Sequence, residues 1–305
     1  MKITFIVNNK NNRLAKVLPG LKQYMQQFTS YEVQFVYTTH KKHAIEIAHQ
    51  AVKNNCEYLI AVGGDGTLNE VINGVMQSNL PAKNLPITGL LPYGSANDFA
   101  RTTHITNAIE QLMQLIKTNS YKTIDLGKIS LLQTGETTYF INITGVGLGP
   151  EVVIRMEKSS AKLGAGFNYF KNIVKGFLNY TKKEASCINK DWQWKGKLLQ
   201  MAIANGRYYG NAICTAPDAR LTDGQFQVVI FGDLTIWDYL KNLNKLKKGV
   251  KINLPQVHYY KAKEVLIKSN DSCGIEADGE YVGLVPATVK VVPAAIRFLA
   301  PEEVY

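Results

Sequence analysis

The segment Tyr58–Glu70, with the sequence YLIAVGGDGTLNE, decides the fold of the first part of the chain. Its beginning, Tyr58–Val62, is a short continuous apolar run, as expected for a strand that is buried on both faces of a parallel sheet. The run ends in Gly63 and Gly64, and apolar residues at helical spacing follow from Leu68 onward. A strand, a glycine turn and a helix in this order indicate a βα unit, in which ligands bind at the carboxyl end of the strand.

The same alternation of strand and helix patterns extends over the first 125 residues. Apolar strands are predicted at Ile3–Val7, Val33–Tyr37 and Thr88–Leu91, and helical stripes over residues 14–28, 44–52 and 105–116. Repeated βα units imply a parallel sheet with helices on both faces. The sequence therefore predicts an N-terminal doubly wound parallel α/β domain.

After Asp125 the pattern changes to short alternating runs, separated by turn pairs such as Asp223-Gly224. This pattern indicates an antiparallel β-sandwich, with one helical insertion around residues 167–182. The strand-like run Ile296–Leu299 is expected to return to the first domain. We therefore predict an α/β domain formed by residues 1–126 and 296–305, and a β-sandwich domain formed by residues 127–295.

The composition excludes several classes of protein. Hydrophobic residues make up 46% of the 305 residues and charged residues 19%, which is too apolar for a disordered chain. No apolar run reaches the ~18 residues that a membrane span needs, and the N-terminal MKITFIVNN is predicted to be a strand rather than a signal peptide. The four cysteines are scattered without a CxxC pair, which argues against a zinc site or disulfides and favours a cytoplasmic location.

The net charge of +11 is concentrated in two Lys-rich segments, residues 158–190 and residues 241–251. Lysines interleaved with apolar residues attract nucleic acid or an anionic membrane surface, although two solvated helices would give the same pattern. The positive excess avoids the glycine turns, and no RNA- or DNA-binding module is present, so we expect no nucleic-acid partner. The expected partner of both segments is an anionic membrane surface.

Asp65 is the unusual member of the first glycine turn. The N–H groups at the start of the following helix suit a phosphate, and a carboxylate beside phosphates requires a cation, which indicates Mg²⁺ held directly or through water. Thr67 and Glu70 have capping-box spacing, so the helix is predicted to begin at Thr67. A plain glycine turn before a capped helix is the alternative interpretation.

A second turn repeats this design in Leu91–Asp98, LPYGSAND, where Ser95 and Asp98 again have capping-box spacing. Two such turns at neighbouring strand ends are expected to face one crevice and to form a phosphate site. Neither turn is a Walker A loop or a Gly-x-Gly-x-x-Gly dinucleotide motif.

The pair of turns resembles the catalytic domain of the diacylglycerol kinase family, which soluble bacterial lipid kinases share with sphingosine and ceramide kinases. The resemblance continues through the chain in NGRYYG (residues 205–210), APDARLTDG (residues 216–224) and DGE (residues 278–280). It implies the two-domain fold of NAD kinase and diacylglycerol kinase-like proteins. It also implies transfer of the γ-phosphate of ATP to a membrane lipid, diacylglycerol giving phosphatidic acid, by a peripheral protein at the inner membrane face.

The resemblance also implies roles for individual residues. ATP would be bound by Asn8, Thr38, Gly64, Asp65, Gly66, Thr67, Leu68, Asn69, Glu70 and Ser95. A carboxylate and water network around the catalytic Mg²⁺ would consist of Asp65, Asp98 and Asp125, and Glu280 would accept the proton of the lipid hydroxyl. A second, structural Mg²⁺ would be held by Arg220, Asp223 and Gln225.

The chain departs from the family pattern in two segments and, more mildly, at Ser95, which replaces the commoner Thr and keeps the hydroxyl. The family's first strand is followed by Asn-Pro-x-x-Gly, whereas Asn8 is followed here by Asn-Lys-Asn-Asn. The family's Gly-x-Gly-Phe-Asp-Ala segment is Gly-Val-Gly-Leu-Gly-Pro in residues 145–150, so that Gly149 stands in place of the Asp. This second change bears on which lipid is accepted.

Three alternatives remain at this stage. An NAD kinase shares the Gly-Gly-Asp-Gly-Thr turn and a β-rich second domain, a kinase could act on another lipid alcohol, and a nucleotide sensor would bind without catalysis. The ordered APDARLTDG and DGE motifs favour a lipid kinase over an NAD kinase. A homodimer is one hypothesis for the oligomeric state.

Overall fold

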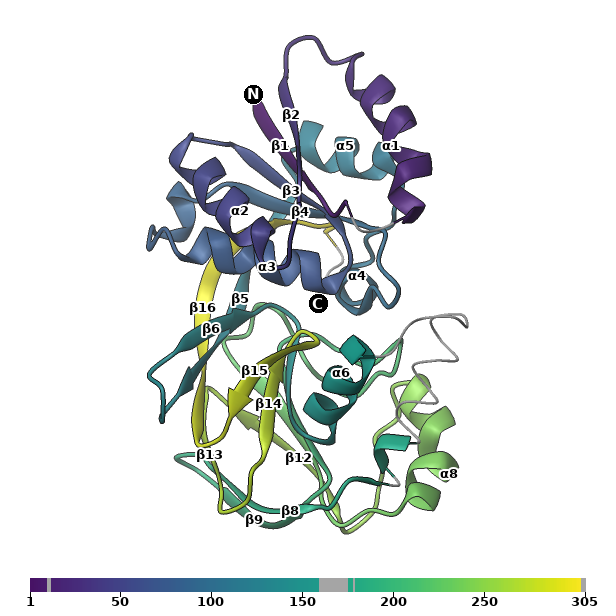
Figure 1. Cartoon of the computed structure of the whole chain (residues 1–305), viewed down its shortest axis with the longest axis vertical. Coiled ribbons are helices and arrows are strands. Elements are labelled where there is room, and N and C mark those ends of the chain that lie inside the picture. Colours follow the sequence, from purple (N-terminus) through teal and green to yellow (C-terminus); the bar gives the residue numbers. More distant parts are fainter. Residues whose placement is uncertain (10–11, 159–174, 178, 303–305) are drawn as a thin grey trace. The chain divides into compact units, whose positions relative to one another are not determined.

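The computed structural model describes residues 1–9, 12–158, 175–177 and 179–302 (Figure 1). Contacts divide the chain into two compact units. The first comprises Met1–Asp125 and Pro293–Tyr305, and the second Leu126–Val292. Strands β5 (Tyr121–Leu131) and β16 (Ala287–Leu299) contribute residues to both units.

The first unit contains a parallel sheet in the order β2-β1-β3-β4, with the end of β16 parallel to β4. Its strands are β1 (Lys2–Val7), β2 (Glu32–Tyr37), β3 (Tyr58–Gly63) and β4 (Ile87–Pro92). Strands β3 and β4 are buried along their whole length, as the continuous apolar runs predict. The predicted parallel α/β fold is confirmed.

Helices cover both faces of this sheet (Figure 1). Apolar side chains of α1 (Asn12–Met25) and α5 (Ile109–Lys117) form one core with those of β1 and β3. On the other face, α2 (His43–Lys53) packs closely on α3 (Asp65–Met76). A Cβ added at Gly74 of α3 would lie 2.2 Å from the carbonyl oxygen of Ile45, so only glycine permits this approach.

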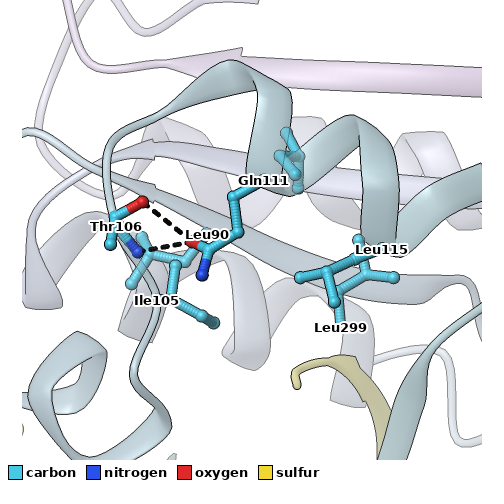
Figure 2. Close-up of a pocket in the computed structure, with 7 residues that line it drawn as sticks. Leu90, Ile105, Thr106, Gln111, Leu115 and Leu299 are labelled. Atoms are coloured by element: carbon cyan, nitrogen blue, oxygen red, sulfur yellow. Dashed lines mark hydrogen bonds between the residues drawn. The ribbon is translucent and has the colours of Figure 1, made fainter. Parts of the chain in front are cut away.

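The helix predicted over residues 105–116 is wrong at its beginning. Residues 104–108 form a loop between the short helix α4 (Asp98–Thr103) and α5. Gln111 holds this loop, because its Oε1 accepts hydrogen bonds from the backbone N–H (2.7 Å) and the hydroxyl (2.9 Å) of Thr106 (Figure 2). The depression beneath it is lined by apolar side chains such as Leu90, Leu115 and Leu299, so it offers no charged group to a ligand.

The second unit is a sandwich of antiparallel strands. One sheet has the order β12-β11-β10-β7-β14-β15, and the other contains β5, β6, β8, β9, β13 and β16. Buried residues of both sheets form one core, in which Val146 and Met201 of the first sheet join Val265 and Val289 of the second. The predicted antiparallel β-sandwich is confirmed.

The strands of the first of these sheets are β7 (Ile143–Gly147), β10 (Gln200–Ala204), β11 (Phe226–Phe231), β12 (Val257–Ala262), β14 (Gly274–Ala277) and β15 (Glu280–Leu284). The others are β6 (Thr137–Phe140), β8 (Lys183–Ile188), β9 (Gln193–Leu198) and β13 (Glu264–Ser269). Helices α6 (Leu148–Lys158) and α8 (Ile236–Lys247) complete the unit.

The helix predicted around residues 167–182 lies largely outside the described residues, and so does most of the first half of the Lys-rich segment 158–190. A short 3₁₀ turn in the first unit, η1 (Ala82–Asn84), precedes β4. In the parts of the chain that the structure describes, no helix is both long and apolar enough to cross a bilayer.

Candidate functional site

The two glycine turns of the first unit touch each other through their backbones. The N–H of Tyr93 donates to the carbonyl oxygen of Gly63 over 2.7 Å. A Cβ added at Gly94 would lie 2.3 Å from the Cα of Gly64, and one added at Gly64 would lie 2.9 Å from the Cα of Gly94. Any side chain at either position would force the turns apart. Both positions therefore require glycine, because the two backbones approach each other closely.

Asp65, which lies in the first glycine turn, binds the backbone that follows the second turn. Its carboxylate accepts hydrogen bonds from the backbone N–H groups of Asp98 and Phe99, each over 3.1 Å. These are N–H groups of the first turn of α4, which have no partner within the helix. Burial raises the pKa of the Asp65 carboxyl, and the N–H donors oppose part of that rise. Asp65 therefore caps α4 across the two turns.

The predicted capping box of Ser95 and Asp98 is wrong. Asn97 precedes α4 in the left-handed conformation, with φ 53°, and makes no side-chain cap. Instead its Oδ1 accepts the N–H of Gly94 over 2.9 Å, which folds the turn back on itself. Ser95 is exposed at the tip of this turn, where its hydroxyl can meet a ligand.

The predicted capping box of Thr67 and Glu70 is also wrong, because α3 begins two residues earlier, at Asp65. The Thr67 hydroxyl accepts a hydrogen bond from Asn8 Nδ2 over 3.0 Å. The Glu70 carboxylate instead accepts the N–H groups of Lys42 (3.0 Å) and Ala44 (3.1 Å) at the start of α2. Both side chains thus tie α3 to other elements, and Gly64, which precedes α3, offers no side chain to cap it.

The remaining residues of the predicted nucleotide site surround the ends of β1, β2 and β3. The Thr38 hydroxyl accepts the N–H of Asn9 over 3.3 Å, and its own N–H donates to Val7 over 2.9 Å. Leu68 and Asn69 are buried in α3, whereas Gly66 is partly exposed. Asn8, Thr38 and Thr67 therefore lie together, and Leu68 serves the core.

The two other predicted carboxylates of the first unit are buried: Asp98 is 5% exposed and Asp125 3%. Asp125 lies on β5, and its Oδ1 accepts the N–H of Ala294 on β16 over 2.8 Å. Among the described residues, His, Cys, Asp and Glu form no group of three that could hold a metal ion. Mg²⁺ prefers carboxylate oxygens and usually keeps several waters, so Asp65 beside Asp98 fits a Mg²⁺ that is held through water.

In the second unit, the DGE motif forms the hairpin turn between β14 and β15. Asp278 and Gly279 both have positive φ, as a two-residue hairpin turn requires. Asp278 does more than turn the chain, because its carboxylate accepts the N–H groups of Ile141 (2.9 Å), Asn142 (3.0 Å) and Ile143 (3.0 Å). The turn is thereby fixed to the start of β7.

The NGRYYG motif lies against the same backbone. Asn205 is fully buried, and its Nδ2 donates to the carbonyl oxygen of Ile141 over 2.8 Å. Asn142 Nδ2 donates to Tyr208 over 2.9 Å, and the Arg207 guanidinium donates twice to the carbonyl oxygen of Pro217 in APDARLTDG. The DGE and NGRYYG motifs therefore meet around residues 141–143, and Arg207 links NGRYYG to APDARLTDG.

Glu280 is the first residue of β15, opposite Ala277, and is partly exposed. The sequence interpretation missed its neighbour Glu276, which is fully buried. Glu276 Oε1 accepts the hydroxyl of Tyr209 over 2.9 Å, and Oε2 accepts the N–H of Gly279 over 2.6 Å. Burial raises the pKa of Glu276 to about 8. An acid between the buried Ile275 and Ala277 was the signal that could have drawn attention to it.

The predicted second Mg²⁺ site contains one carboxylate, that of Asp223, in a turn where Gly224 has φ 68°. Asp223 Oδ1 accepts the N–H of Gln225 over 3.1 Å, and Oδ2 lies 3.5 Å from the ammonium of Lys261. The side chain of Arg220 is exposed. Lys261 therefore competes for Asp223 with any bound cation.

Comparison with protein families matches both halves of the chain. The diacylglycerol kinase catalytic domain matches residues 2–129, and the YegS C-terminal NAD kinase beta sandwich-like domain matches residues 142–300. A protein named diacylglycerol kinase from Staphylococcus haemolyticus is 28% identical over 280 residues, covering 90% of this chain and 80% of that protein. One from Staphylococcus aureus (strain Newman) is 29% identical over 260 residues, covering 84% and 78%.

The fold is also found among solved structures. A crystal structure of a diacylglycerol kinase from Bacillus anthracis superimposes with a TM-score of 0.71 at 17% identity, and a second structure from that organism with a TM-score of 0.77 at 21% identity. Each comparison covers 100% of this chain and 98% of the other. At this level of identity the likeness shows the shared fold.

Removal of the Asp65 carboxylate is expected to loosen α4. Asp65→Ala leaves the N–H groups of Asp98 and Phe99 without an acceptor, and loss of a helix cap costs ~1 kcal/mol. We expect a lower unfolding free energy in urea and faster amide exchange in residues 97–103, with a smaller effect for Asp65→Asn, which keeps one oxygen. Asp191→Ala, which removes an exposed acid, is the control. Equal exchange in Asp65→Ala and the wild type would contradict the capping role.

Glu276 is expected to make stability depend on pH. The folded protein keeps the Glu276 proton up to a pKa of about 8, whereas the unfolded chain releases it near the ordinary 4.5. The folded state binds more protons between these values, so stability falls as pH rises through this range, by up to ~1.4 kcal/mol per pH unit. Urea unfolding of the wild type and Glu276→Gln at pH 5.5, 6.5 and 7.5 tests this. The slope should be shallower in the variant, and parallel profiles would contradict the assignment.

Proposed function

The chain belongs to the diacylglycerol kinase catalytic-domain family, and from that premise we propose that it is an ATP-dependent lipid kinase. It transfers the γ-phosphate of ATP to the hydroxyl of a membrane lipid, converting diacylglycerol to phosphatidic acid. The observation that carries this proposal is the pair of glycine turns joined by Asp65 in the family's catalytic domain. The family match over both halves of the chain supports it.

The nucleotide is proposed to bind at the ends of β1–β4. Gly64 offers no capping side chain at the start of α3, so the N–H groups there suit the phosphates, with the positive end of the helix dipole behind them. Gly64 and Gly66 allow the phosphates to approach the backbone, and Ser95 offers a hydroxyl from the second turn. Asn8, Thr38 and Thr67 form the neighbouring polar wall, and Glu70 keeps α2 in place beside it.

The proposed donor is ATP with Mg²⁺, and Asp65, Asp98 and Asp125 would hold the ion through water. The ion, when bound, neutralises charge on the β- and γ-phosphates. Asp65 is suited to this because the N–H groups of Asp98 and Phe99 fix its carboxylate in one orientation. The same bonds keep the two turns at a fixed spacing for the phosphates.

Glu280 is the proposed general base. The lipid hydroxyl oxygen bonds to the γ-phosphorus, the bond from that phosphorus to the β,γ-bridging oxygen breaks, and ADP leaves. The hydroxyl proton passes to the Glu280 carboxylate. Glu280 is partly exposed and stands on a turn that Asp278 fixes by three hydrogen bonds, so its backbone is held while its side chain can meet substrate.

A second Mg²⁺ is proposed at the turn of Arg220, Asp223 and Gln225, with Asp223 as the carboxylate ligand and backbone oxygens as further ligands. The positive φ of Gly224 makes this turn tight enough to wrap a cation. Lys261 already neutralises Asp223 in part, so a cation there would have to displace this ammonium. The role of this ion would be structural.

Transfer of labelled γ-phosphate from Mg-ATP to diacylglycerol in anionic mixed micelles tests the reaction, with NAD and other lipid alcohols as rival acceptors. We expect labelled phosphatidic acid from the wild type and a loss of kcat of ~100-fold or more in Glu280→Gln, because general base catalysis contributes that much. Glu264→Gln, an exposed acid on β13 of the same unit, is the matched control. Labelled NADP without a lipid product would instead establish an NAD kinase.

We propose that helix α8, which contains the first part of the Lys-rich segment 241–251, faces the membrane. Trp237 is 67% exposed, and Lys241, Lys245 and Lys248 follow it at spacings of four, four and three residues, which places them on one stripe. Asp238 is engaged in capping the helix through Thr235. An exposed tryptophan beside lysines is typical of a helix at an anionic lipid interface.

The homodimer hypothesis can be tested by light scattering.

Charge reversal on this stripe is expected to weaken membrane binding. Each lysine near an anionic surface contributes ~1 kcal/mol, so Lys241→Glu with Lys245→Glu should lower affinity for phosphatidylglycerol vesicles by ~30-fold or more. ATP affinity should not change. The control carries the same charge change at exposed Lys53 and Lys83 of the first unit. Equal vesicle binding by the two double variants would show that α8 is not the docking element.

A further inference from the structure

Glu276 has no part in the reaction as described, yet it is the most deeply buried acid near Glu280. It contacts the hydroxyl of Tyr209 with one oxygen and the N–H of Gly279 with the other. Because it is 0% exposed, it cannot touch ATP or lipid. A carboxyl group in this position requires a structural or positioning explanation, since burial of an acid is costly.

Strand alternation places Glu276 on the face of β14 opposite Ile275 and Ala277, which lie in the sandwich core, and a β-bulge on β15 lies beside it. Ile275 pairs with Gly283 and Glu276 with Tyr281, so Val282 is an extra residue on β15. Bulges of this kind redirect side chains and recur beside active sites. Glu276 reaches forward from here to Gly279, the residue immediately before Glu280.

Two glycines make the space for this carboxyl group. A Cβ added at Gly145 would lie 2.5 Å from Glu276 Oε1, and a Cβ added at Gly149 would lie 2.5 Å from the Tyr209 hydroxyl. The side chain of Gln200 occupies the same place and accepts the N–H of Gly149. Gly149 stands where the family motif has Asp, so an acid at that position is incompatible with Tyr209 and Gln200 as they lie here.

We propose that Glu276, held by Tyr209, is a positioning residue for Glu280: it fixes Gly279 and thereby the start of strand β15. This inference rests on the proposed function for its catalytic consequence, and on geometry for the positioning itself. Asp278 anchors the first residue of the turn to residues 141–143, and Glu276 anchors the second. Together, Asp278 and Glu276 hold the turn in one arrangement.

The positioning does not require a charge. Burial raises the pKa of Glu276 to about 8, and the nearby carboxylate of Asp278 opposes its ionisation further. Near neutral pH the group is therefore mainly protonated. A glutamine, which is neutral and of the same shape, should hold Gly279 as well, whereas leucine offers no acceptor.

The test combines kinetics with amide exchange in Glu276→Leu, Glu276→Gln and Tyr209→Phe, each at pH 7. Glu276→Leu should lower kcat at least tenfold with KM for ATP unchanged, because the proposed ATP residues belong to the other unit. Amide exchange of residues 277–281 in the free protein should be faster. In Glu276→Gln, kcat and the exchange rate of residues 277–281 should lie within twofold of the wild-type values. In Tyr209→Phe, both quantities should lie between those of the wild type and those of Glu276→Leu.

Wild-type kcat and exchange in Glu276→Leu would overturn the proposal, and so would a Glu276→Gln variant as impaired as Glu276→Leu. If Glu276→Leu does not fold, Tyr209→Phe decides: slower turnover with faster exchange supports the positioning role, and no change in either contradicts it. If the wild type makes no phosphatidic acid, the proposed function fails, but exchange in residues 277–281 still shows whether Glu276 holds the turn.

Discussion

The contact of the Asp65 carboxylate with two backbone N–H groups of α4 is the constraint on which the first unit depends. It joins two βα turns whose glycines already touch, and it fixes both relative to the strand ends. An apolar side chain in its place would leave the N–H groups of Asp98 and Phe99 without this acceptor. The same carboxylate stands where the phosphates of ATP and their Mg²⁺ are proposed to bind, so one residue serves the fold and the site.

The second unit uses buried carboxyl groups in the same way. Asp278 gathers three backbone N–H groups, and Glu276 takes a fourth, so that the turn before Glu280 is held on both sides. In both units a carboxyl group replaces regular hydrogen bonding where the backbone must leave a helix or strand geometry. The two turns lead into residues for which we propose roles in the reaction, Asp65 at the start of α3 and Glu280 at the start of β15.

The sequence was sufficient for the fold and insufficient for the detailed contacts. Continuous apolar runs identified β3 and β4, and the glycines after them marked the ligand end of the sheet, because those features depend only on neighbouring residues. Both capping boxes were wrong because spacing cannot reveal a distant competitor: Glu70 caps a helix that begins 27 residues earlier, and Asp65 caps one that begins 33 residues later. Glu276 was missed because alternation places it opposite the core residues Ile275 and Ala277 without revealing that distant residues such as Tyr209 bury that face as well. The roles of the remaining site residues stay predictions.

The two joined turns are proposed to form one nucleotide site. Hydrogen–deuterium exchange of the intact protein with and without Mg-ATP tests this proposal, because peptides covering residues 63–70 and 93–99 report on each turn separately. We expect ATP to slow exchange in both turns together, with half-maximal protection at one ATP concentration. Protection of only one turn, or of neither while ATP binds elsewhere in the chain, would contradict it.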